Sequence, residues 1–258
     1  MRSRAILLLV VGGLVVASCG DGESASTSQR EVAPTATVPA PTTVLAPSEG
    51  SGCEVLHTPG EYEGVATFGD FDQPYWIVVP DSYTDVAPAP LYVNLPSGDG
   101  SHHAGMNGWR PYLDDLNGLM VIVNTATPQA VSPDALLSLI DQLSSAYCVN
   151  PRQVHVMGTA WTGRIAENLA CNASDRIASF ISAPNVANAS DCTPARPVPL
   201  LTFTGDTDRS ATTDLVTRWA VVNGCDPEPA VEDLGSGVLR KTFHNCEADI
   251  LFYDIQGM

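Results

Sequence analysis

The fold is decided by the stretch Val154-His155-Val156-Met157-Gly158-Thr159-Ala160-Trp161-Thr162-Gly163. Its first four residues favour a strand, Gly158 permits a sharp turn, and a helical pattern begins near Gly163. The apex of the predicted turn is Ala160. A methyl group cannot attack a carbonyl carbon, whereas an activated hydroxyl or thiol can. The stretch therefore predicts a strand–turn–helix corner that carries no nucleophile at its apex.

Around this corner, apolar runs alternate with helical patterns along most of the chain. We predict strands at 75–79, 90–95, 119–123, 154–157, 177–182, 199–204 and 250–255. We predict helices at 133–147, 164–170 and 212–222. Near-continuous apolar runs are typical of strands that are buried on both faces. The alternation therefore predicts an α/β fold with a mostly parallel central sheet and helices on both faces.

In such sheets, the loops at the carboxyl ends of the strands build the functional site. The sequence places 96–109, 158–163 and 205–210 at that edge, together with whatever follows Ile255. The candidate site residues are therefore sought in these loops.

The first residues have the pattern of an export signal. Arg2 and Arg4 precede an apolar run, 5–16, and the small residues Ala17 and Ser18 precede Cys19. This end resembles a bacterial lipobox, in which the cysteine is diacylated after cleavage. We therefore expect residues 1–18 to be a signal peptide and Cys19 to hold the protein on the extracytoplasmic side of the cell membrane. An ordinary signal peptide with an incidental cysteine is the alternative.

Residues 19–52 are rich in Ser, Thr, Pro and Ala and show no apolar periodicity. Such a segment cannot bury enough surface to offset its ordering entropy, so we predict a disordered tether. Residues 53–258 are long enough for one domain with a sizeable core.

The formal net charge is −17. A surface of that charge repels nucleic acid, which is excluded as a partner, and anionic lipid headgroups.

Six cysteines remain when Cys19 is set aside, and an even number in an exported chain favours three disulfides. Six cysteines allow fifteen pairings. We favour the two local bridges and the pair that they leave, namely Cys171–Cys192, Cys225–Cys246 and Cys53–Cys148. A zinc cluster is the rival interpretation, but the sequence has no C-x-x-C pair. No metal and no cofactor are expected.

The domain resembles the secreted polyhydroxybutyrate depolymerase and feruloyl esterase family of α/β-hydrolases. The resemblance covers roughly 75–258 and is most specific over 147–158 and 168–171. Further similar segments are 197–199, 204–208, 223–226 and 245–246. The resemblance implies an α/β-hydrolase fold and the chemistry of a carboxylic ester hydrolase, which uses a serine at a G-x-S-x-G turn.

The chain departs from this family at the residues that carry the chemistry. Ala160 stands where the family has its serine, and only the acid position is retained, by Asp208 or less favourably by Asp206. The family's histidine follows the last strand after a turn, and this sequence stops at 257–258, about where that turn would begin. The oxyanion loop is altered as well, and its expected residues are Ser97, Gly98, Thr159 and Trp161.

Other residues could replace the missing serine or histidine, or hold a metal. Thr159, Thr162 and Ser97 carry hydroxyls near the apex, although a hydroxyl beside a turn is more often bonded to the backbone. Asp99, His102 and His103 could hold a metal, or form a solvated loop. We interpret His244 as a surface residue and His155 as a packed strand residue. His57 has no evident partner in the sequence.

The resemblance and its departures together predict a catalytically inactive, exported lipoprotein. Its role would be to bind a small ester, an aromatic compound or a polymer fragment, or to contact a partner in the cell envelope. Trp161 and Trp109 could supply an aromatic binding surface, although core packing is the commoner role of a tryptophan. The alternatives are an active ester hydrolase of which this sequence is a truncated reading, and a destabilised relic without a role.

Overall fold

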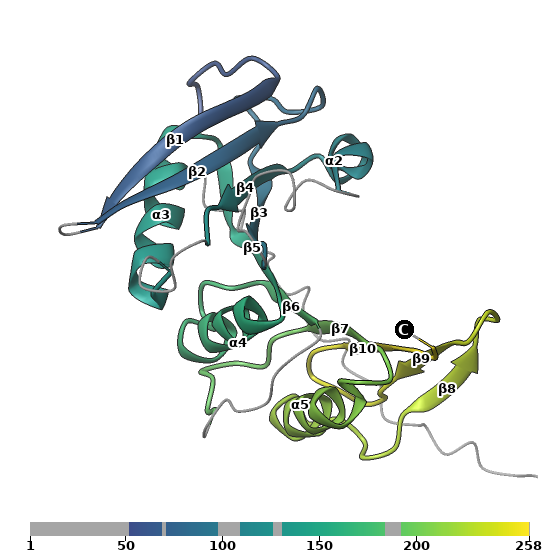
Figure 1. Cartoon of the computed structure of the whole chain (residues 1–258). Helices are drawn as coiled ribbons and strands as arrows, with labels where there is room; N and C mark the ends of the chain where they lie inside the picture. Colours follow the sequence, from purple (N-terminus) through teal and green to yellow (C-terminus); the bar gives the residue numbers. More distant parts are fainter. Residues whose placement is uncertain (1–51, 69–70, 98–108, 126–130, 184–191, 258) are drawn as a thin grey trace, which may run out of the picture. The chain divides into compact units, whose positions relative to one another are not determined.

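A computed structural model describes residues 52–68, 71–97, 109–125, 131–183 and 192–257 of the 258-residue chain. The chain divides into two compact units, Met1–Val44 and Leu45–Met258, and all described residues belong to the second unit. Everything below concerns this second unit, whose elements are labelled in Figure 1.

A single ten-stranded sheet forms the centre of the unit, in the order β1-β2-β4-β3-β5-β6-β7-β10-β9-β8. Its strands are β1 (Gly60–Phe68), β2 (Phe71–Val79), β3 (Ala89–Leu95), β4 (Leu119–Val123), β5 (Val149–Thr159), β6 (Ser179–Ala183), β7 (Leu200–Thr204), β8 (Ala230–Asp233), β9 (Val238–Thr242) and β10 (Ile250–Ile255). The six strands from β4 to β10 in the sheet order pair in parallel, and antiparallel strands extend both ends. The predicted mostly parallel sheet is confirmed.

Helices cover both faces of this sheet (Figure 1). They are α2 (Arg110–Leu116), α3 (Pro133–Ala146), α4 (Trp161–Asn172) and α5 (Arg209–Val222). Leu136, Leu169 and Leu215, from the last three helices, all pack in the main buried cluster. Leu113 of α2 packs in a second cluster on the other face. The two clusters separate because successive side chains of a strand point to opposite faces.

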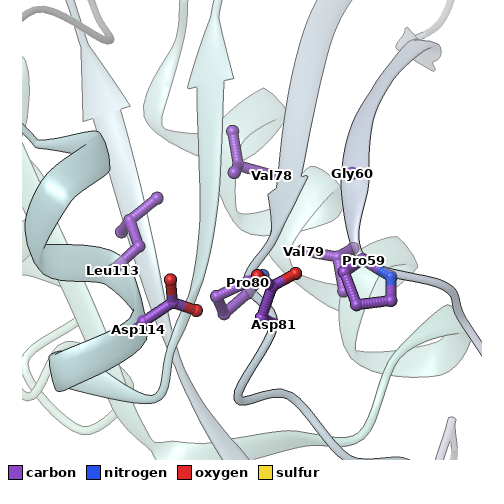
Figure 2. Close-up of a pocket in the computed structure, with 8 residues that line it drawn as sticks. All are labelled: Pro59, Gly60, Val78, Val79, Pro80, Asp81, Leu113 and Asp114. Carbon is purple, nitrogen blue, oxygen red and sulfur yellow. The ribbon is translucent and has the colours of Figure 1, made fainter.

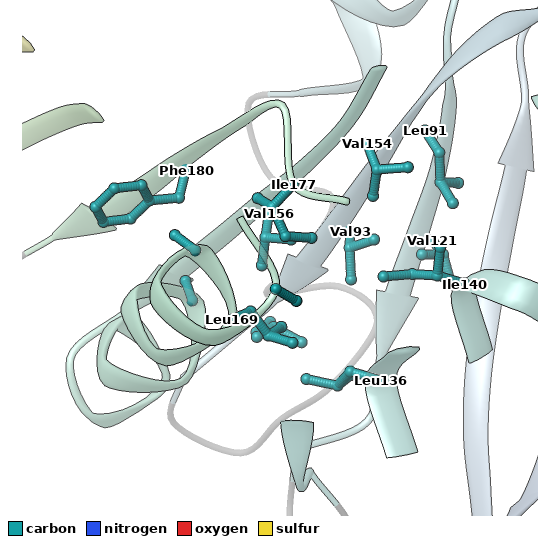
Figure 3. Packing of buried hydrophobic residues seen from close by; sticks show 14 of the residues in the cluster. Leu91, Val93, Val121, Leu136, Ile140, Val154, Val156, Leu169, Ile177 and Phe180 are labelled. Atoms are coloured by element: carbon teal, nitrogen blue, oxygen red, sulfur yellow. The ribbon is translucent and has the colours of Figure 1, made fainter. Parts of the chain in front are cut away.

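The main cluster shows why the apolar runs became central strands. Val93 and Val156 occupy paired positions on β3 and β5 and are almost fully buried, and Val121 pairs with Val93 from β4. Figure 3 shows these valines facing Leu136 of α3 and Leu169 of α4. On the opposite face, the intervening residues join the second cluster: Met120, Ile122 and Met157.

Three disulfides close the unit, and each joins the pair that the sequence favoured. They are Cys53–Cys148, Cys171–Cys192 and Cys225–Cys246. Such bonds persist in oxidising compartments, and their presence is compatible with an extracellular protein. Within the described residues, none of the helices has the length and apolar character required to traverse a bilayer.

Candidate active-site corner

The corner between β5 and α4 is tightly built around Ala160. This residue has φ 49° and ψ −126°, a backbone conformation that residues other than glycine rarely adopt. Its N–H donates to the carbonyl oxygen of Ala183 over 2.9 Å, and its own carbonyl accepts from the N–H of Gly163 over 3.0 Å. Neighbouring strand and helix thus hold the strained residue in place.

Two glycines make the corner sterically feasible. A Cβ atom on Gly158 would lie 2.3 Å from the carbonyl oxygen of Thr162, and one on Gly163 would lie 2.8 Å from the Oγ of Ser182. Both distances are shorter than real Cβ contacts, so the backbone of the helix can approach the strand only at glycine. The local sequence therefore dictates the sharp turn.

Thr162 holds the first turn of α4 against β3. Its side chain is fully buried, and its Oγ1 accepts the N–H of Thr159 over 2.9 Å. The same oxygen lies 2.6 Å from the carbonyl oxygen of Leu95 and 2.7 Å from that of Thr159, and its single proton can serve one of them at a time. This hydroxyl is bonded to the backbone, as we expected for a hydroxyl beside a turn.

A hydroxyl pair lies beside the apex. The Oγ of Ser97, which follows β3, is 2.7 Å from the Oγ1 of Thr159, and both residues are half-buried. The structure thus brings together the candidate residues Ser97, Thr159, Ala160 and Trp161, which come from two loops. Gly98 lies outside the described residues.

Of the three described histidines, two are engaged with other partners and one is exposed. In β5, His155 stacks on Tyr92, accepts from or donates to the Oγ of Ser179 over 2.7 Å, and has a pKa lowered by burial. His57 lies 2.8 Å from the carbonyl oxygen of Ala146. His244 is exposed, as predicted for a surface residue. Other candidates, namely Asp99, His102 and His103, lie outside the described residues.

Both tryptophans weighed as binding surfaces are partly buried. Trp161 packs against the main cluster and Trp109 against the second cluster. These contacts favour the core-packing interpretation for both rings. Trp161 keeps part of its ring accessible next to the apex.

The two aspartates after β7 have different surroundings. Asp208 is half-buried directly before α5, and its carboxylate forms no hydrogen bond or ion pair with the described residues. Asp206 is exposed, pairs with Arg209 over 2.7 Å and accepts the N–H of Gly257 over 3.0 Å. The hydrogen bond from Arg209, followed by that from Gly257, lowers the pKa of Asp206. Of the two aspartates, Asp208 therefore keeps its carboxylate available.

Sequence inspection missed a buried ionic group next to this loop. Asp254 of β10 is 4% exposed and lies 2.8 Å from Arg209 and 2.9 Å from Lys241. Burial opposes its ionisation, but hydrogen bonds from Lys241 and Arg209 outweigh burial and lower its carboxyl pKa. An aspartate at a core-facing position of the apolar run 250–255 was the available signal.

One cavity, of about 340 Å³, lies away from the corner (Figure 2). It is lined by Pro59, Gly60, Val78, Val79, Pro80, Asp81, Leu113 and Asp114. The end of β2 forms one wall, and β2 runs antiparallel to β4, so the cavity sits at the amino ends of the parallel strands. Ala160 lies at the opposite edge. In the described ranges, no group of three or more His, Cys, Asp or Glu side chains is placed to hold a metal.

Several known proteins are similar to this chain. No model of a protein family matches the chain. Feruloyl esterase B of Piromyces equi is 23% identical over 210 residues, which cover 66% of this chain and 39% of that protein. An acetyl xylan esterase from Aspergillus awamori superposes with a TM-score of 0.59 at 11% identity, covering 77% of this chain and 93% of the other.

Two further solved esterases share the fold. A thermostable esterase superposes with a TM-score of 0.57 at 14% identity, covering 76% of this chain and 54% of the other. An arylesterase does so with a TM-score of 0.54 at 10% identity, over 81% and 79%. The domain has the α/β-hydrolase fold. The predicted fold class is confirmed, and the chain spans 39% of the length of the feruloyl esterase that it matches.

In an α/β-hydrolase, the strand–turn–helix corner presents the nucleophile, and a backbone N–H of the next residue helps to bind the developing oxyanion. The corner of this domain has Ala160 at that apex and Trp161 as the next residue. The loop after β7, with Asp208, emerges from the same edge because the two strands are parallel members of one sheet.

Proposed function

We propose that this α/β-hydrolase domain is a binding protein without the turnover of a serine esterase. One observation carries the proposal: the apex of the corner is Ala160, held in the strained conformation that a hydrolase uses to expose its serine. A carbon atom stands where acyl transfer requires an oxygen.

The missing oxygen has a large expected effect. Removing the serine of a catalytic triad costs on the order of 10⁶ in turnover, because the triad acts as a unit. What remains over water, roughly 10³ to 10⁴, comes from the oxyanion hole and from binding. Thr162 offers no substitute, because its hydroxyl is buried and bonded to the backbone.

The retained architecture supports a role in ligand binding. A relic without function would have no reason to keep a strained Ala160, two sterically required glycines and a half-buried Asp208 at one edge. The ligand class that we propose follows the resemblance and the relatives: a small ester, an aromatic compound or a polymer fragment. Membership of the polyhydroxybutyrate depolymerase branch is part of this proposal.

The proposal extends to the site of action. We propose that residues 1–18 direct export, that Cys19 carries the acyl anchor in the cell membrane, and that 19–52 tether the domain of residues 53–258 on the extracytoplasmic side. The net charge of −17 argues against nucleic acid as a partner.

Calorimetry and kinetics with the same compounds test this function. The purified protein is titrated with methyl ferulate and with a hydroxybutyrate trimer, and hydrolysis of both is followed by chromatography. We expect saturable binding of at least one compound and no hydrolysis above the buffer rate. Hydrolysis at ordinary esterase rates would favour an active ester hydrolase with a longer chain. Absence of both binding and hydrolysis would contradict the binding role.

A further inference from the structure

A second site lies at the edge of the sheet opposite to Ala160. A hollow of about 300 Å³ is lined by three arginines and one aspartate: Arg152, Arg176, Arg196 and Asp175. Arg152 lies in the first half of β5, while Arg176 and Arg196 precede β6 and β7. These strands are parallel, so all three arginines gather at their amino ends.

Among the residues that the structure describes, two of the three guanidinium groups have no carboxylate partner. Arg176 is neutralised by an ion pair with Asp141. Arg196 donates to two backbone carbonyl oxygens, those of Ile177 over 2.7 Å and Pro197 over 2.9 Å. The side chain of Arg152 has no partner among the described residues, although its N–H donates to the Oδ1 of Asn150 over 3.0 Å. The lining therefore holds two guanidinium groups outside any ion pair of the described residues, against the one carboxylate of Asp175.

The backbone around the hollow is fixed before any ligand arrives. Ser174 is 1% exposed, and its Oγ accepts the N–H groups of Ala195 and Arg196 over 2.8 and 3.4 Å. The disulfide Cys171–Cys192 joins the end of α4 to the same segment. Preorganised donors lose less entropy on binding than mobile ones. The segment that carries Arg196 is thus held in place at the hollow.

The concentration of charge is also unusual for this chain. Three of its twelve basic residues line one hollow in a protein of net charge −17. A planar guanidinium group matches the spacing of the oxygens of phosphate and carboxylate, and such charge-assisted hydrogen bonds are among the strong ones. Guanidinium groups that line one hollow favour a ligand with several acceptor oxygens on one centre.

We propose that this hollow, which we call the arginine hollow, binds a tetrahedral oxyanion, namely a phosphate or sulfate group. Arg152 supplies free hydrogen-bond donors, and Arg196 supplies a positive charge that its backbone partners hold in place. Asp175 in the lining lowers the net positive charge of the site. The site is independent of the corner at Ala160, because the two lie at opposite edges of the sheet.

Anion titrations of the purified protein test the arginine hollow. Its melting temperature is measured against sodium phosphate and sodium sulfate, with sodium chloride at matched ionic strength as the reference. Specific binding raises the melting temperature with a saturable dependence on the anion. We expect this for phosphate and sulfate and not for chloride. An equal response to chloride would overturn the proposal.

Variants locate the effect. Arg152→Gln should weaken phosphate binding roughly tenfold or more, because charge-assisted hydrogen bonds are lost. Arg152→Lys should recover only part of it, since the fork of donors is absent. Arg164→Gln is the matched control: it changes the net charge equally, is exposed on α4 and has no side-chain partner in the described ranges. Binding that is unchanged in Arg152→Gln, or lost equally in Arg164→Gln, would overturn the assignment.

A final comparison distinguishes the source of the phosphate. Dimethyl phosphate mimics a phosphate carried in a diester, and inorganic phosphate is the free ion. Binding of both anions would support an esterified ligand, and binding of inorganic phosphate alone would support the free ion. Each result is compared with Arg152→Gln, which should weaken the binding of whichever anion binds.

Discussion

The hydroxyl of Thr162 lies 2.6 Å from the carbonyl oxygen of Leu95, and this contact joins the start of α4 to the end of β3. The same oxygen accepts the N–H of Thr159 just before the apex. One buried side chain therefore fixes the corner from both sides. Thr162 is accommodated at this corner because its buried hydroxyl bonds to backbone groups on both sides.

Thr162→Val should destabilise the domain by about 1–3 kcal/mol, because buried backbone groups are left without a partner while the shape is preserved. Urea unfolding monitored by circular dichroism measures the change. Thr213→Val is the matched control, since Thr213 is exposed on α5 and its hydroxyl donates to the carbonyl of Arg209 over 2.7 Å. Equal losses in the two variants would show that burial at the corner does not matter.

Ala160→Gly should stabilise the domain by roughly 1 kcal/mol, because glycine adopts the positive φ of 49° without the strain of a Cβ atom. Ala166→Gly, in the middle of α4, should act in the opposite direction, since glycine lowers helix stability and a buried methyl group is lost. Melting temperatures of the two variants give the comparison. A destabilised Ala160→Gly would mean that the corner is not strained.

Ala160→Ser should remain without esterase turnover. Among the described histidines, His57 and His155 are engaged with other partners, and His244 precedes β10, at the amino ends of the parallel strands and away from Ala160, so a serine at the apex would gain no base from them. The measurement is hydrolysis of p-nitrophenyl acetate by the variant and the parent protein. A rate in the esterase range for Ala160→Ser would show that a base and oxyanion donors are present, and would favour the hydrolase alternative.

Asp254→Asn should lower stability at neutral pH by about 1–2 kcal/mol, because a nearly buried carboxylate bonded to two cations is lost. The folded-state pKa of Asp254 lies below its usual 3.8, so the carboxylate stabilises the fold above that value. The contribution falls away as the pH drops through the lower folded-state pKa. The difference from the parent protein should therefore shrink at about pH 3 and below.

Denaturant unfolding at neutral pH and at about pH 3 measures the difference in stability between Asp254→Asn and the parent protein. Glu232→Gln is the control, since Glu232 is exposed on β8 and pairs with Arg240 on the neighbouring strand. A deficit in Asp254→Asn that stays constant down to low pH would contradict a contribution from ionised Asp254.

Periodicity predicted the central strands well because their side chains are buried on both faces. The bounds of β4 and β10 match the prediction, and α4 and α5 begin three residues earlier than predicted. The strand before the corner is longer than predicted, because 149–153 pair in the sheet although they contain Pro151 and exposed polar residues. Burial of apolar residues is visible in a sequence, whereas backbone pairing of exposed residues is not.

The edge elements escaped prediction for the same reason. All four residues of β8 are exposed, and β1 carries glycines and exposed glutamates, so neither strand shows an apolar run. The arginine hollow was equally hidden, because Arg152 and Arg196 are 44 positions apart and meet only when parallel strands align their amino ends. The corner at Ala160 was predictable because its chemistry lies within ten consecutive residues.

A fluorophosphonate probe tests the central claim most directly, since such probes label activated serine nucleophiles covalently. The purified protein is incubated with the probe, and its intact mass and tryptic peptides are measured by mass spectrometry. We predict an unchanged mass, because the apex residue is Ala160 and the hydroxyl of Thr162 is bonded to the backbone. A stoichiometric adduct on Ser97, Thr159 or any neighbouring residue of this edge would contradict the account.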